Sequence, residues 1–534
     1  MSGRRAGGFG LENVVRTTIR MGALKWRMDR LGVSPLGRVS TQALVRARLM
    51  LGAGMFAALT ILTPPASAET LLEALSATYG YNPRLDAQRA FQRGTDEDVS
   101  RAMSGYRPTV TGSADLGIER NDTRPSAADD GWRKPRGYSI EAVQPIFRGF
   151  RTRNAVNNAE ATVRAERENL RDVERTVLLQ SVTAYMDVVR DQELVRLNEN
   201  NVNVLTRELK AAQDRFAVGE VTRTDVAQAE ARRADAVSRL DAARANLRTS
   251  RGSFEQVVGH PPQNLSWPAP PDQHIPGSLQ EAIRICNNES PLVVAALYRE
   301  QAAKYLVDQI RGELLPSVEL QASYSDRFNS GPLFDEDETS IVRGVMTVPI
   351  YEAGDVYARV RQAKHNHIGF IQQIEQVRTE EQQSLVAAWS QLEAARAQLE
   401  SDRVAVESNK VALQGVREEE KVGQRTLLDV LNAELEYLDA QVSLETTRRN
   451  LVVAGYAVIS AMGRLDAAWI GAAAYVYDPV VHYKEVRRKW LGLSITRGDG
   501  TREEFEATPV EDAPASLKGG GSWETHSSGG WEPQ

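Results

Sequence analysis

The sequence predicts an α+β membrane protein built from two copies of one helix–strand–strand–helix–helix unit. Three observations support this fold class. The chain repeats itself with a period of 204 residues, as the pair Val218 and Val422 shows. Each copy contains a long helical stretch with apolar residues at every seventh position. Each copy also contains short stretches in which apolar and polar residues alternate.

The duplication extends well beyond one motif. The stretch FAVGEVTRTDVAQAE at 216–230 resembles EKVGQRTLLDVLNAE at 420–434, and the segment at 73–90 resembles the one at 281–298. A Pro-rich, helix-hostile stretch separates the copies and predicts a linker. The predicted organisation is a signal peptide at 1–68, a first repeat at 69–259, a linker at 260–277, a second repeat at 278–466 and a C-terminal extension at 467–534.

The first 68 residues have the features of a secretory signal. Basic residues precede an apolar run from Leu49 to Leu62, and Ala66 and Ala68 offer a small-residue cleavage site. The run is too short for a permanent membrane-spanning helix, and an N-terminal anchor is the alternative. The single cysteine, Cys286, lies far from this site, so we expect no lipid anchor on the mature N-terminus.

An opening helix, at 70–104 in the first copy, is expected to lead into two strands. After Pro108 in the first copy and Pro316 in the second, apolar or small residues alternate with polar ones. Such alternation is expected where one face of a sheet meets lipid and the other meets water. A soluble hairpin with one buried face is the alternative.

Four strands per chain constrain the assembly. Four strands are too few to close a barrel, and an open sheet edge in lipid leaves unpaired backbone groups that cost several kcal/mol each. If the strands cross a membrane, several chains must therefore combine them in one barrel. Three chains would supply twelve strands.

The long helix of each copy is expected to pack as a coiled coil. In the first copy it spans 149–217, which at 1.5 Å per residue is roughly 100 Å. The opening helix and the returning helix at 220–258, placed end to end, would match this length. The heptad positions are Val188, Val195, Val202, Leu209 and Phe216 in the first copy and Leu385, Leu392, Leu399, Val406 and Leu413 in the second.

These features together resemble the TolC family of outer-membrane efflux and secretion ducts, over about residues 70–466. The motifs are the duplication, NPRLDAQRA, the strand ends QPIFRG and VPIYEAG, and two tips of the form V-G-x-x-T-x-x-D-V. The resemblance implies a trimeric, 12-stranded outer-membrane β-barrel that continues into a long periplasmic α-helical coiled-coil tunnel. Strand ends in the family often carry two adjacent glycines, whereas this chain keeps only Gly149 and Gly354.

The resemblance also implies a periplasmic gate at the tips. In the family, a Thr–Asp pair on the first tip binds a Tyr and an Arg on the second. Thr224 and Asp225 match the pair and Arg425 matches the Arg, but Glu420 occupies the Tyr position. A carboxylate facing Asp225 would repel it, so the gate is expected to depend on Arg425 or Lys421.

Other tip residues have implied roles too. Asp429, with Asn432 nearby, matches the narrowest point of the tunnel, where a ring of carboxylates would favour cations. The alternative for Asp225 is that it and Thr222 cap the returning helix. The expected adaptor contact is formed by Val218, Gly219, Thr222, Val422, Gly423 and Thr426.

The sequence predicts no enzyme, no cofactor and no metal site. His365 and His367 are two residues apart, about 200° around a helix, so they cannot share a metal there. We find neither a nucleophile motif nor a phosphate-binding loop. The net charge of −6 argues against a nucleic-acid partner.

We therefore expect a passive homotrimeric duct in the outer membrane, surrounded by lipid. Its partners would be a periplasmic adaptor (a membrane fusion protein) and an inner-membrane ABC transporter or proton-driven pump. Residues 477–490 resemble tails of the type I secretion branch, and the missing lipid-anchor cysteine also favours protein secretion. Small-molecule efflux and a periplasmic coiled-coil adaptor or scaffold are the alternatives. The Gly/Ser-rich end of the extension predicts disorder.

Overall fold

The computed structural model describes most of the chain after the predicted signal peptide. Residues 1–66 and 67–534 form two separate units, and every described helix and strand belongs to the second unit. The predicted signal peptide, except its last residue, and the Gly/Ser-rich end lie outside the described residues. The described residues are 68–122, 131–331, 335–471, 476–496 and 502–503.

The predicted unit occurs twice. The first copy contains α2 Leu71–Tyr81, α3 Pro83–Met103, η1 Ser104–Tyr106, β1 Thr109–Leu116, β2 Glu119–Asn121, β3 Gly131–Arg133, β4 Arg136–Arg148, α4 Arg151–Ala217 and α5 Arg223–Val258. The second contains α6 Leu279–Glu289, α7 Pro291–Arg311, η3 Gly312–Leu314, β5 Ser317–Phe328, β6 Glu336–Thr347, α8 Asp355–Lys421 and α9 Leu427–Ala461. The remaining elements are η2 Asp272–His274 in the linker, and α10 Ala467–Ile470, α11 Pro479–Val486, β7 Ile495–Thr496 and β8 Arg502–Glu503 in the extension.

The opening helix is not continuous, which corrects the prediction of one helix over 70–104. Asn82 has an extended ψ of 118° between α2 and α3, and its side-chain oxygen accepts a hydrogen bond from Arg84 N at 3.0 Å. Pro83 occupies the first turn of α3, where its missing N–H is tolerated. The Asn-Pro pair therefore ends one helix and caps the next.

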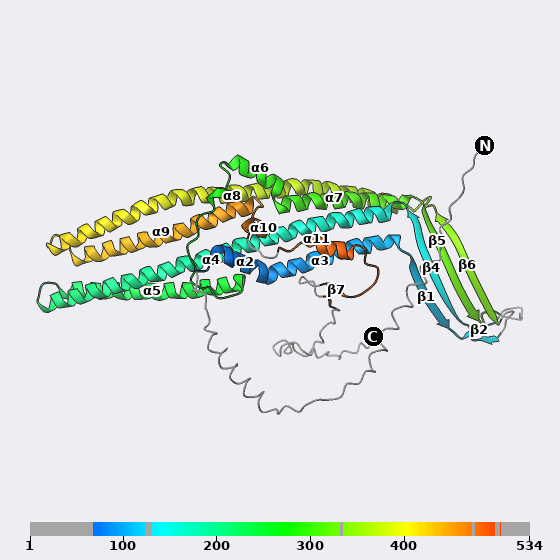
Figure 1. Cartoon of the computed structure of the whole chain (residues 1–534), viewed down its shortest axis with the longest axis horizontal. Helices are drawn as coiled ribbons and strands as arrows, with labels where there is room; N and C mark the ends of the chain where they lie inside the picture. Colours follow the sequence, from blue (N-terminus) through cyan, green and yellow to red (C-terminus); the bar gives the residue numbers. More distant parts are fainter. Residues whose placement is uncertain (1–67, 123–130, 332–334, 472–475, 497–501, 504–534) are drawn as a thin grey trace, which may run out of the picture. The chain divides into compact units, whose positions relative to one another are not determined.

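The four long strands form one antiparallel sheet in the order β1-β4-β5-β6 (Figure 1). The helices that adjoin them pack in the matching order, α3 on α4, α4 on α7 and α7 on α8. The central pair β4–β5 joins the two copies. Within the described residues, β1 and β6 each pair on one side only, so both edges of the sheet are open.

The two faces of the sheet differ in polarity, as the alternation predicts. Cross-strand partners share a face. One apolar cross-strand row consists of Val110, Ala142, Ala322 and Val342. A row on the opposite face carries only hydroxyl side chains: Ser113, Ser139, Ser325 and Thr339. Because Val110 and Val342 are 69% and 75% exposed, the apolar face has no cover within one chain.

The main core lies midway along the long helices. It gathers buried residues of α2, α4, α5, α6, α8 and α9, including Val188, Leu385 and Leu392 of the predicted heptads. Burial decreases toward the tip, and the last heptad residue of the first copy, Phe216, is 46% exposed. The linker packs against this core through Trp267, and the buried Tyr185 hydroxyl lies 2.8 Å from the carbonyl oxygen of Ser266. The linker is therefore an integral part of the fold.

No helix in the described part of the chain combines the length and the apolar character needed to cross a membrane.

One half-buried carboxylate predicts a pH dependence of stability. Glu174 on α4 accepts a hydrogen bond from Ala467 N at 2.6 Å, and loss of solvent raises its pKa to about 7. The folded state therefore holds a proton on Glu174 that the unfolded state releases between the ordinary pKa of 4.5 and about 7. Stability from this group is fully present below that window and is lost as the pH rises through it.

We expect Glu174→Gln, which keeps the acceptor for Ala467, to stabilise the protein by about 1–3 kcal/mol at pH 8 and to have little effect at pH 4.5. Thermal unfolding of wild type and variant at both pH values measures this difference. Glu97→Gln, at an exposed position, is the control. An equal shift for Glu174→Gln at both pH values would contradict the assignment.

Candidate functional site

Both helical hairpins end in the same tight turn. After α4, Gly219 has a φ of 83°, a left-handed conformation that glycine adopts without strain. Its N–H donates to Phe216 O at 3.0 Å, and Glu220 N donates to Arg215 O at 3.0 Å. Gly423 repeats this turn after α8 with a φ of 76°. These bonds satisfy carbonyl groups that the helix end would otherwise leave free.

Each returning helix begins with a capping box. Thr222 N and Thr222 Oγ1 both donate to Asp225 Oδ2 at 2.8 Å, and Asp225 N donates back to the threonine hydroxyl at 3.3 Å. Thr426 and Asp429 repeat this arrangement on the second tip. The threonine backbone bond, followed by its hydroxyl bond, lowers the pKa of both carboxyl groups. Both aspartates therefore carry a negative charge at neutral pH, and the capping alternative for Thr222 and Asp225 is confirmed.

The tips also present apolar side chains to solvent. Val218 is 73% exposed and Val422 is 69% exposed, each directly before its turn glycine. Because each valine precedes a hydrogen-bonded turn and a capped helix, burying it against another molecule would cost less in ordering than burying a side chain on an unstructured loop.

The two hairpins contact each other near their tips through an ion pair. Arg215 Nη1 at the end of α4 lies 2.5 Å from Glu420 Oε1 at the end of α8, and the Glu420 side chain is 14% exposed. Glu420 therefore has a cationic partner within the chain, and its expected repulsion of Asp225 stays a prediction. Within the chain, Arg425 Nε donates to Glu419 Oε2 at 2.9 Å and Lys421 binds Glu418, so neither cation binds Asp225.

Further along, α5 and α9 contact each other through polar and apolar groups. Arg232 Nη2 donates to Asn432 Oδ1 at 2.7 Å, which gives Asn432 a partner on the other hairpin. Arg239 binds Asp439 at 3.3 Å. Beneath these bonds, Leu431 is buried in a small apolar cluster with residues of α4 and α5. The hairpins are thus joined at several points along their tips.

Sequence reasoning missed Arg215 and Arg232 as contact residues. The duplication gives no signal for these contacts, because the residues 204 positions later are Glu419 and Glu436, whereas the observed partners are Glu420 and Asn432. The expected constriction residue Asp429 and the expected gate residue Thr224 both lie on these tips, where Thr224 is exposed.

In the described residues, no group of three or more histidine, cysteine or acidic side chains is placed to hold a metal ion. Burial raises the pKa of the Cys286 thiol to about 11, which makes it a poor nucleophile and metal ligand.

The chain resembles known proteins over most of its length. It matches the model of a family described as outer membrane efflux protein at residues 74–260 and 283–467. It is 40% identical over 442 residues to the outer membrane efflux protein BepC of Brucella suis, covering 82% of this chain and 95% of that protein. It is 24% identical over 424 residues to the outer membrane protein TolC of Escherichia coli, covering 75% of this chain and 83% of that protein.

Two further likenesses extend this result. The alkaline protease secretion protein AprF of Pseudomonas aeruginosa is 22% identical over 418 residues, covering 74% of this chain and 86% of that protein. The crystal structure of the CmeC outer membrane channel of Campylobacter jejuni superposes with a TM-score of 0.65 at 18% identity, covering 78% of this chain and 89% of that one. The structural likeness confirms the fold of the single chain.

Proposed function

The chain belongs to the outer membrane efflux protein family, and we propose that three copies of it form a passive exit duct. The observation that carries this proposal is the four-stranded sheet with two open edges and one exposed apolar face. In lipid, such edges must pair, and pairing β6 of one chain with β1 of the next would close a twelve-stranded barrel. The hydroxyl-rich face would then line the water-filled lumen.

The family membership locates the chain in the outer membrane, so the alternative of a periplasmic adaptor or scaffold is abandoned. The helices that continue from the strands would form the tunnel through the periplasm. At its mouth, the exposed Val218 and Val422 with their neighbouring turn residues would contact a periplasmic adaptor. Energy would come from an inner-membrane pump, because the sequence contains no nucleotide-binding motif of its own.

The cargo proposed from the sequence is a protein exported by an ABC transporter in type I secretion. The likeness to AprF, named as a protease secretion protein, and the type I-like tail at 477–490 support it. Small-molecule efflux is the second candidate, favoured by the name of BepC at 40% identity. Deleting the gene separates the two: loss of secreted proteins from the medium supports secretion, and drug sensitivity with unchanged secretion supports efflux.

Purification tests the duct itself. The processed protein in detergent should have a mass of three chains and should form single channels in planar bilayers. A stable monomer that still inserts and conducts would contradict the barrel argument.

We propose that Asp429 forms the tunnel constriction together with Asn432, and that Arg215, Thr224, Asp225, Glu420 and Arg425 form the gate. The tip ion pair Arg215–Glu420 supports the gate, because it fixes the second hairpin to the first. The position of Asp429 in the first turn of α9, directly after the tip, supports the constriction, because a trimer would bring three charged carboxylates together there.

We expect Asp429→Asn to reduce the cation preference of the channel and to weaken its block by multivalent cations. Asparagine keeps an oxygen that can cap α9, so loss of charge is the main change. Reversal potentials in a salt gradient measure the preference. Glu418→Gln is the control, since Glu418 is an exposed carboxylate on the same tip that belongs to neither the proposed gate nor the proposed constriction. Equal effects of both variants would contradict a specific constriction at Asp429.

A further inference from the structure

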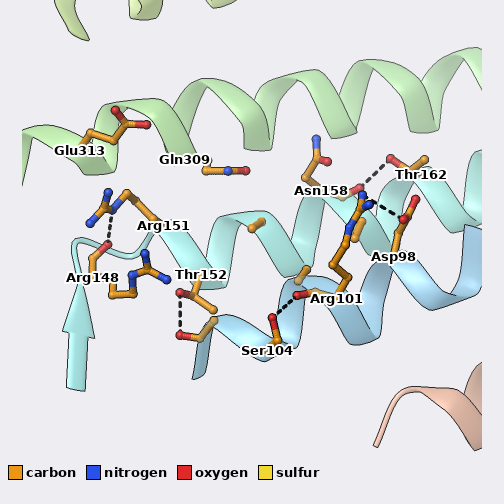
Figure 2. Close-up of a pocket in the computed structure, with 14 residues that line it drawn as sticks. Asp98, Arg101, Ser104, Arg148, Arg151, Thr152, Asn158, Thr162, Gln309 and Glu313 are labelled. Carbon is orange, nitrogen blue, oxygen red and sulfur yellow. Dashed lines mark hydrogen bonds and ion pairs between the residues drawn. The ribbon is translucent and has the colours of Figure 1, made fainter. Parts of the chain in front are cut away.

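A cavity of about 520 Å³ lies at the junction between the sheet and the helices. It is lined by the end of α3, the end of β4, the first turns of α4 and the end of α7. Figure 2 shows polar side chains from all of these elements around it. None of these residues belongs to the tips or to the proposed gate.

Some of the charged side chains that line the cavity have a partner of opposite charge and others do not. Three arginines and two carboxylates contribute to its wall: Asp98, Arg101, Arg148, Arg151 and Glu313. Arg101 lies 3.0 Å from Asp98. Glu313 is bound by both terminal nitrogens of Arg359 on α8 and is thereby neutralised. Arg148 and Arg151 remain, and among the described residues neither has a carboxylate partner.

The two arginines present unused donors. Arg151 Nε donates to the backbone oxygen Arg148 O at 3.1 Å, which holds the Arg151 side chain against the end of β4. Arg148 Nε is buried without a hydrogen-bond partner in the described part of the chain. An oxyanion that reached the terminal guanidinium nitrogens of the two arginines from the cavity would supply the negative charge that they lack. Arginine donors match the geometry of phosphate oxygens in particular.

The register places this cavity on the polar side of the sheet. Arg148 pairs with Ser317, which alternation puts on the same face as Glu319 and Gln321. In the proposed barrel, that face lines the lumen, so the position of the site in the duct rests on the proposed function. The hydrogen bond from Arg151 to the backbone of Arg148 lies within one chain and does not depend on the assembly.

We infer that Arg148 and Arg151 form a binding site for a phosphate group at the junction of barrel and tunnel. The phosphate would lie between the two guanidinium groups. The cavity is much larger than a phosphate ion, and the hydroxyl and amide groups of Thr152 and Gln309 line the rest. The expected ligand class is therefore a phosphorylated polar molecule, with inorganic phosphate as its smallest member.

The test is binding of phosphate to the purified full-length protein in neutral detergent at low ionic strength, measured by calorimetry. We expect saturable binding to wild type and at least a tenfold loss of affinity in Arg148→Gln and in Arg151→Gln. Arg153→Gln is the matched control, because Arg153 lies about 200° around α4 from Arg151 and lines a different cavity. It should bind phosphate like wild type.

Further arms identify the source of the phosphate and keep the inference falsifiable. If the protein binds both inorganic phosphate and glycerol 3-phosphate, the ligand is a soluble molecule. If it binds only dioctanoyl phosphatidylglycerol, the ligand is a lipid headgroup. Either result supports the site. No binding of any probe to wild type, or equal loss in Arg153→Gln, overturns it. If Arg148→Gln does not fold, the result with Arg151→Gln decides.

The outcomes for the phosphate site and for the duct are distinguishable. If the protein forms trimeric channels but binds no phosphate, only the phosphate site is rejected. If it binds phosphate but forms no channel, only the duct is rejected.

Discussion

Arg215→Ala and Glu420→Ala are each expected to shift the periplasmic mouth of the proposed duct toward its open state. Each variant removes the tip ion pair that joins α4 to α8. Arg215 is 42% exposed, so solvent screening limits the pair to about 0.5–1 kcal/mol per chain. Three such pairs in the proposed trimer would favour opening roughly tenfold or more. Single-channel conductance and sensitivity of cells to large antibiotics measure the change.

Charge reversal provides the sharper test of this pair. Arg215→Glu combined with Glu420→Arg should restore the low conductance that each single reversal loses. Arg239→Ala, which removes an exposed ion pair between the same hairpins farther from the tips, is the control and should change conductance less. If Arg425→Ser opens the mouth while Arg215→Ala does not, the gate depends on the bridge implied by the family resemblance.

Gly149→Ala is expected to prevent assembly of the protein in the outer membrane. Gly149 has a φ of 58°, and a Cβ atom there would lie 2.1 Å from Gly312 O. The backbone of β4 and α4 must therefore separate from the end of α7, at the junction on which the register of β4 and β5 depends. Overpacking costs about 1–3 kcal/mol, and the left-handed conformation adds about 1–2 kcal/mol. Heat-stable trimers in outer-membrane fractions measure the outcome.

Gly354→Ala is the matched control for this prediction. Gly354 lies in the corresponding turn after β6, one position beyond the counterpart of Gly149, and has a φ of 84°, but nothing lies within 4 Å of its added Cβ. The control should therefore lose about 1–2 kcal/mol from backbone strain alone and should still assemble. Equal defects in both variants would mean that the left-handed turn, and not the contact with Gly312, is the limiting feature.

Sequence reasoning predicted the features that repeat in the chain. The duplication is read from the 204-residue repeat. The four long strands and the long helices follow from shorter periods, because apolar residues at every second position suit a strand and apolar residues at every seventh position suit a packed helix. Sequence reasoning failed where a local break in the pattern, or a contact with a residue far along the chain, determines the structure. Asn82 and Pro83 interrupt the opening helix, and the Pro-rich linker packs against the core at Trp267.

The tips and the junctions between strands and helices show which features follow from local sequence and which depend on tertiary packing. At the tips, Gly423, Thr426 and Asp429 form a turn and a cap within seven residues, so the sequence by itself determined this geometry. The long-range partners were decided only in the tertiary structure. Gly149 and Ala353 are equivalent in the duplication and both have a positive φ, yet Ala353 is exposed whereas Gly149 lies against the backbone of Gly312. The reason is that each residue along a helix turns the side chain by 100°, so the partner of any position depends on how distant helices are rotated and aligned when they pack.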